Sequence, residues 1–192
     1  MQTAVVNVWA ATLSGVVNMK TKKISYCGIS AALVTAIMLA AHIPFLTYAI
    51  PCIASVIIMG VVIELGVKYA LATYFTSLLP VFLFCEPESK LLYICLMGFY
   101  PVLKAVFEKT PSRILEYVLK FAVANAAFFA VYYVSTFVMN IPLDDMGEFG
   151  KYSALILLGA ANVTFLLYDI CISKLSFSYM ILIHPTVKKM LK

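Results

Sequence analysis

Charged residues are scarce in this sequence. Asp, Glu, Lys and Arg make up 12% of the 192 residues, whereas apolar residues make up 64%. Soluble globular domains carry about 25% charged residues, so this composition excludes a disordered chain and argues against an ordinary water-soluble enzyme. A membrane-spanning helix needs about 20 mostly apolar residues. We therefore predict an integral membrane protein.

Motifs for catalysis and metal binding are also missing. The five cysteines form no CxxC pair, and neither histidine belongs to an HExxH motif. No Walker-type glycine loop is present, so we expect no nucleotide hydrolysis by the chain itself. We predict a non-enzyme without cofactor or metal. The net charge of +5 includes no long basic run, which argues against nucleic acid as a partner.

Long apolar segments separated by Pro, Gly and charged residues dominate the chain. They predict an all-α polytopic membrane bundle, in which Gly66 makes the tight turn between the second and third spans. The six expected spans are Ile24–Ala41, Tyr48–Ile63, Gly66–Phe84, Leu91–Phe107, Ile114–Met139 and Tyr152–Ser173.

Basic residues in this layout favour one orientation. If both termini are cytoplasmic, every Lys and Arg except Lys90 and Lys151 lies on the cytoplasmic side, as the positive-inside rule requires. We expect a multi-pass protein of the cell membrane, and specifically of a bacterial plasma membrane. Residues 1–18 form an extension that is interfacial or not native, and residues 19–175 form the transmembrane domain. Residues 176–192 are a basic tail, whose apolar start extends the last helix or lies at the inner interface.

Small residues recur every four positions on the first span, at Gly28, Ala32, Ala36 and Ala40. Such a face lets two helices approach closely in lipid. It packs against a neighbouring helix of this chain or docks another membrane subunit, and both alternatives stay open. A second stripe on the fifth span, consisting of Ala122, Ala126 and Ala130, is expected to pack within the bundle.

Polar and aromatic residues near the predicted outer end, with two asparagines inside spans, indicate a binding site for a small molecule. The tyrosines alternatively form an aromatic belt at the headgroups, and the asparagines bond across helices or line a cavity. The candidate substrate-binding residues are His42, Phe45, Tyr48, Tyr93, Asn125, Tyr132 and Asn162.

Two further features near the predicted inner end have a structural interpretation. Asp169 is expected to form an ion pair with Lys174 or Lys120. The segment from Gly98 to Pro101 predicts a kinked span, with Lys104 extending its side chain toward the interface.

The basic start at Lys20, the alanine face Ala32-Leu-Val-Thr-Ala36 and the six-span layout resemble the S components of energy-coupling factor vitamin transporters, over roughly Met19 to Ser173. The short Gly60 to Gly66 connection is also similar. The resemblance implies that Ala32 and Ala36, extended by Gly28 and Ala40, contact a shared transmembrane coupling subunit that works with two ATPase subunits.

The resemblance further implies capture of a vitamin-like small molecule at the outer face, where the loop around Phe45 closes over the site. Two other classes of protein stay open. One is a helical membrane protein that scaffolds or regulates an envelope complex without transport. The other is an autonomous secondary carrier, although no inverted repeat or midplane carboxylate supports it.

Overall fold

The computed structural model describes residues 2–43, 46–134 and 153–191, and within these ranges the chain is helical without any strand. The predicted all-α helical bundle is therefore confirmed. Its elements are α1 (Gln2–Leu39), the 3-10 turn η1 (Ala40–His42), α2 (Ala49–Leu65), α3 (Val67–Phe84), α4 (Pro87–Leu92), the π-helical turn η2 (Tyr93–Met97), α5 (Tyr100–Phe107), α6 (Arg113–Tyr133), α7 (Ser153–Leu182) and α8 (His184–Leu191).

Five helical segments in the described part of the chain are long and apolar enough to cross a membrane. They are Lys20–His42, Val67–Phe84, Pro87–Phe107, Arg113–Tyr133 and Leu158–Leu182. These segments correspond to five of the six expected spans. The remaining one, α2, has 17 residues and is about 25 Å long at 1.5 Å per residue, slightly less than the hydrocarbon thickness of about 30 Å.

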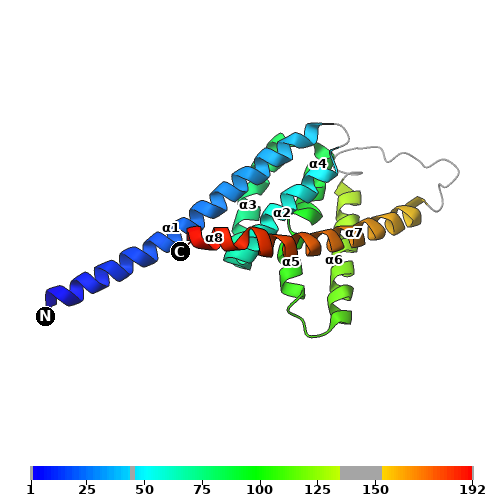
Figure 1. Cartoon of the computed structure of the whole chain (residues 1–192). Helices are drawn as coiled ribbons and strands as arrows, with labels where there is room; N and C mark the ends of the chain where they lie inside the picture. The colour runs from blue at the N-terminus through cyan, green and yellow to red at the C-terminus, as the bar shows by residue number, and fades with distance from the viewer. Residues whose placement is uncertain (1, 44–45, 135–152, 192) are drawn as a thin grey trace.

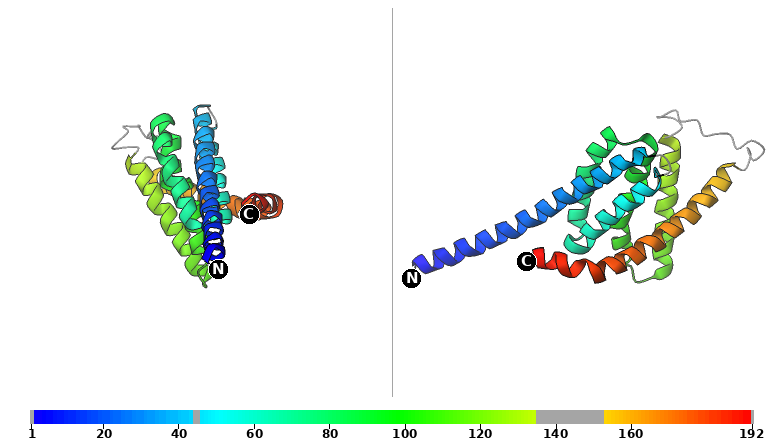
Figure 2. Two further views of the ribbon diagram at one scale, coloured as in Figure 1. Left: turned by 90° about the vertical axis from the view of Figure 1, so that its left-hand side faces the viewer. Right: turned by 45° about the horizontal axis from the view of Figure 1, so that its top comes forward.

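Both ends of the chain continue transmembrane helices. Residues 2–19 belong to α1, whose N-terminal part projects well beyond the bundle (Figures 1 and 2). α7 runs through to Leu182, so the apolar start of the tail extends the last helix, the first of the two expected alternatives. α7 also crosses α6 obliquely, whereas α2 and α3 run alongside α1 (Figure 1).

The connections between helices alternate between two ends of the bundle. The segment after α1 and the short helix α4 lie at one end, which we call the α4 end; the turn between α5 and α6 lies at the opposite end (Figure 1). Gly66 joins α2 to α3 in a tight turn with φ of 90°. Only glycine adopts this conformation without steric cost, and the predicted role of Gly66 is confirmed.

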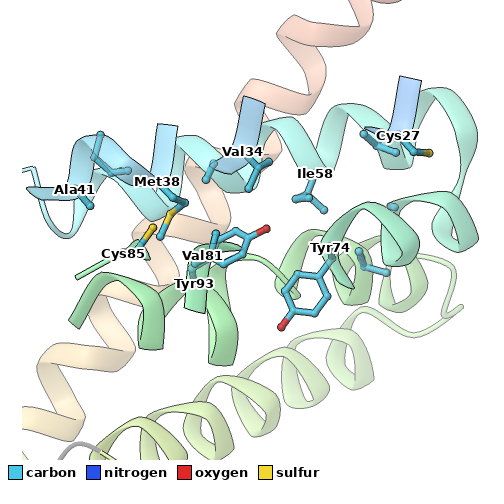
Figure 3. Packing of buried hydrophobic residues seen from close by; sticks show 14 residues of the cluster. Cys27, Val34, Met38, Ala41, Ile58, Tyr74, Val81, Cys85 and Tyr93 are labelled. Carbon is cyan, nitrogen blue, oxygen red and sulfur yellow. The ribbon is translucent and has the colours of Figure 1, made fainter. Parts of the chain in front are cut away.

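The larger core forms where α1, α2, α3 and η2 meet (Figure 3). Val34, Ala41, Ile58 and Val81 are fully buried there, and so is the ring of Tyr93. A second cluster joins α5, α6 and α7 through residues such as Tyr100, Phe165 and Tyr168. In both clusters, aromatic rings fill the space between neighbouring helices.

The helix of the fourth span is interrupted close to the position where the sequence predicted a kink. The π-helical turn η2 interrupts the helix between α4 and α5, and such turns bend helices because an extra residue enters the hydrogen-bond ladder. Gly98 follows it, and a Cβ there would lie 2.8 Å from the rings of Tyr74 and Tyr93. Glycine is required at this position because two aromatic rings occupy the space of a side chain.

Candidate functional site

Side-chain hydrogen bonds tie the α1–α2 connection to the start of α4. The Tyr48 hydroxyl donates to Glu88 Oε2 at 2.8 Å, and the Thr47 hydroxyl lies 3.3 Å from Glu86 Oε2. The Ser89 hydroxyl donates back to the Thr47 carbonyl oxygen at 2.9 Å. We call these five residues the loop latch. It fixes the connection against the α4 end, where the sequence predicted a loop that covers a ligand.

The loop latch is polar but shows no catalytic geometry. Tyr48 is 61% exposed, and its hydrogen bond to Glu88, with partial burial, raises the pKa of the phenol above its ordinary value. The phenol is therefore neutral at physiological pH and acts as a hydrogen-bond donor. This arrangement holds a loop in place and leaves both carboxylates as acceptors.

The two intramembrane asparagines contact each other. Asn125 Nδ2 donates to Asn162 Oδ1 at 3.1 Å, and Asn162 Nδ2 donates to Asn125 Oδ1 at 3.0 Å. Each amide also donates to a carbonyl oxygen of its own helix, one turn earlier. Of the two expected alternatives, the structure shows the hydrogen bond across helices, which satisfies both amides within the predicted spans.

The other predicted substrate-binding residues lie apart from this asparagine pair. His42 is exposed and its Nδ1 lies 3.0 Å from the Leu39 carbonyl oxygen, while Tyr132 is half exposed near the end of α6. Tyr93 is fully buried, and its hydroxyl lies 2.7 Å from Ser77 Oγ in the core. Phe45 lies outside the described residues. Of these residues, His42 and Tyr93 contact partners outside the predicted set.

The small-residue face of α1 points away from the bundle. Gly28, Ala32 and Ala36 are exposed and Ala40 is half exposed, and a Cβ added at Gly28 would meet no atom within 4 Å. The helix packs instead through its other side, where Ala31, Val34, Met38 and Ala41 are buried. Of this face, only Ala40 in η1 packs against the core, so packing within the chain is not what the structure shows for Gly28, Ala32 and Ala36.

The second alanine stripe corrects our expectation. Ala122, Ala126 and Ala130 were expected to pack within the bundle, but all three are exposed. Ala124 and Ala127 are buried in their place, because the side of α6 that carries Asn125 and Lys120 faces α7 and α5. Small residues occur on both sides of α6, so spacing alone did not distinguish the packed side.

Three helices share an ionic cluster that the sequence revealed only in part. Lys104 Nζ pairs with Asp169 and lies 3.3 Å from Glu108, while Lys120 Nζ lies 3.5 Å from Asp169 and 2.6 Å from Glu116. The Tyr100 hydroxyl also donates to Asp169. Lys120 was one of the two expected partners, whereas the other, Lys174, is exposed.

Lys104 was expected to extend toward the interface, and this was wrong. It is 4% exposed because Asp169, Glu108 and the Ser173 hydroxyl hold its ammonium group inside the bundle. The short connection Glu108 to Ser112 brings Lys104 and Lys120 to the same level on α5 and α6. The cluster joins α5, α6 and α7, and its buried ions all have partners.

An apolar groove of about 480 Å³ lies along α3. Its lining residues are Phe75, Leu78, Leu79, Phe82, Leu83 and Ile94. The groove belongs to a predicted span and has almost no polar group to orient a solute, so it suits lipid chains better than a vitamin-like ligand.

Among the described residues, no group of three or more His, Cys, Asp or Glu side chains is placed to hold a metal ion. Comparisons with known proteins found no matching family, no matching curated protein and no matching solved structure. The functional argument therefore depends on the residues of this chain.

Proposed function

We propose that this chain is the substrate-binding membrane subunit of an ATP-driven uptake transporter, as its resemblance to S components implies. The observation that carries the proposal is the exposed face of Gly28, Ala32 and Ala36 on α1. A helix surface made of small residues lets the backbone of a partner helix approach closely, and this close packing stabilises helix association in lipid. The proposed partner is a transmembrane coupling subunit that works with two ATPase subunits.

The loop latch supports capture of a small molecule at the α4 end. All five of its residues carry a hydroxyl or a carboxylate, and Tyr48 remains exposed. In the proposed cycle these groups release the connection for ligand entry and rejoin over the bound molecule. The ligand is a vitamin-like solute, and ATP hydrolysis takes place in the separate subunits.

The test is assembly of the tagged full-length chain in its native membrane. We expect it to co-purify with a polytopic coupling subunit and two ATPases, identified by mass spectrometry, and to retain a small molecule that solvent extraction releases. The substitutions Ala32→Leu and Ala36→Leu together should reduce the coupling subunit at least tenfold, because the larger side chains prevent close approach. Both positions are exposed, so the variant should fold normally.

A matched control is available on α6. Ala122→Leu with Ala126→Leu makes the same change on another exposed stripe, and assembly should be retained. Normal assembly of the α1 variant would contradict the proposed docking face.

The exposed α6 stripe favours a second candidate function, a membrane scaffold that binds more than one helix. In that case both double variants lose partners, no ATPase is among them, and extraction yields no small molecule. Purification of the wild-type chain alone separates the two proposals.

A further inference from the structure

Two helices that contact each other, α1 and α8, both carry lysines. α8 packs beside α1 (Figure 1). Lys20, Lys188 and Lys189 are exposed, while Lys22 and Lys23 are half exposed. We call these five residues the lysine patch. It lies at the end of the bundle that the sequence predicts to be cytoplasmic.

Specific contacts fix α8 in this position. His184 Nδ1 at the start of α8 lies 3.0 Å from Glu64 Oε1 at the end of α2, and the Glu64 side chain is only 2% exposed. One turn before, the Tyr179 hydroxyl lies 3.4 Å from the Tyr26 hydroxyl of α1. The tail is therefore attached to α1 and α2 through named side chains, and the lysine patch has a defined geometry.

The charge of the lysine patch is not neutralised by the described part of the chain. The ion pairs among the described residues involve Lys104, Lys120 and His184 as the basic partners. None of them joins a carboxylate to a lysine of the lysine patch. The Glu64 carboxylate at the end of α2 is buried against His184. Lys23 lies over the Tyr69 ring, 5.8 Å from its centroid, which leaves its charge in place.

Exposed apolar side chains on α1 and at the end of α7 adjoin the lysine patch in the sequence. Ile24 on α1 is 66% exposed, and on α7 Met180, Ile181 and Leu182 are 54%, 59% and 73% exposed. An apolar surface that ends at a group of lysines has the profile of a membrane boundary, where acyl chains give way to headgroups. An acidic protein segment would satisfy the charge but leave this apolar surface uncovered.

We propose that the lysine patch is a binding site for anionic phospholipid. The phosphate-bearing headgroup lies among Lys20, Lys22, Lys188 and Lys189, and the acyl chains lie along Ile24 and the end of α7. Each lysine near an anionic membrane surface contributes about fivefold in affinity, so the patch favours an anionic over a zwitterionic lipid. The proposal does not depend on a transport partner.

Native mass spectrometry tests the proposal directly. The purified full-length chain in detergent is mixed with equal amounts of phosphatidylglycerol and phosphatidylcholine, and the ratio of bound lipids is measured. We expect a preference for phosphatidylglycerol that falls by roughly 25-fold in the variant Lys188→Gln with Lys189→Gln. Lys188→Arg with Lys189→Arg keeps the charge and should keep the preference, which excludes misfolding as the cause.

Lys68→Gln with Lys109→Gln is the matched control, because it removes two exposed lysines from the same end of the bundle but outside the lysine patch. The control should retain the preference. Equal retention of both lipids by the wild type, or an equal loss in the control, would overturn the site.

Two further outcomes would also reject a lipid site. Displacement of the lipid by millimolar inorganic phosphate would show a site for soluble phosphate. Loss of a co-purifying protein in the Lys188 and Lys189 variant, with an unchanged lipid ratio, would show a protein-docking surface.

Discussion

Replacing Asp169 with Asn tests whether the ionic cluster holds α5, α6 and α7 together. The substitution keeps the shape of the side chain and removes the charge that faces Lys104 and Lys120. Their side chains are only 5% and 4% exposed, so water compensates for little of the loss. The variant therefore leaves two buried ammonium groups with fewer opposite charges.

The size of the effect follows from the partners that remain. Removing one member of a buried ion pair costs about 3 to 5 kcal/mol. Lys120 keeps Glu116 at 2.6 Å, whereas Lys104 keeps Glu108 at 3.3 Å, whose side chain is 49% exposed. We expect the lower end of the range, about 3 kcal/mol. For a chain of this size this corresponds to a decrease in Tm of about 6 to 12 °C.

Thermal unfolding of the purified protein in detergent measures the change. Glu88→Gln is the control, because it also neutralises a carboxylate but lies in an exposed position of the loop latch, and its Tm should change by less than about 2 °C. Adding Lys104→Met to Asp169→Asn should recover much of the loss, since it removes the more weakly partnered ammonium group. A Tm for Asp169→Asn within about 2 °C of the wild type would refute the reasoning.

Two further substitutions can be checked with the same assay. Gly98→Ala should lower the free energy of unfolding by about 1 to 3 kcal/mol, because its Cβ would lie 2.8 Å from the rings of Tyr74 and Tyr93. Gly159→Ala in α7 meets no atom within 4 Å and should raise the free energy of unfolding slightly, because Ala favours the helix more than Gly does; equal losses would contradict the steric argument. Asn125→Leu should cost about 1 kcal/mol because it leaves the Asn162 amide without its partner across the helices; the double variant with Asn162→Leu should be closer to the wild type, and an additive loss would argue against pairing.

The helical bundle was predictable because it depends on composition and on strong punctuation. Apolar segments of about 20 residues require helices in lipid, and prolines and Gly66 mark where they end. The kink near Gly98 was predicted for the same reason. These features depend on local sequence, so they can be predicted before it is known which helices are neighbours.

Pairings between helices were harder to predict because they depend on the rotation of each helix about its own axis. Asp169 was placed with Lys120 correctly, yet its main partner is Lys104 on α5, which the sequence separates from it by 65 residues. The interruption at η2 turns α5 so that Lys104 faces inward. The sequence predicted a kink in this span but not the direction in which the helix turns, so the predicted direction of Lys104 was wrong.

The rotation of α1 connects the fold to the proposed function. α1 has one face of small residues and one face of larger apolar residues. Burying the larger side chains removes more apolar area from the surroundings and therefore stabilises the bundle more. α1 places Val34 and Met38 in the core, and this choice leaves Gly28, Ala32 and Ala36 on the surface. Because the core buries the face with the larger side chains, Gly28, Ala32 and Ala36 stay exposed, and the docking of a second helix that we propose uses the surface that this packing leaves uncovered.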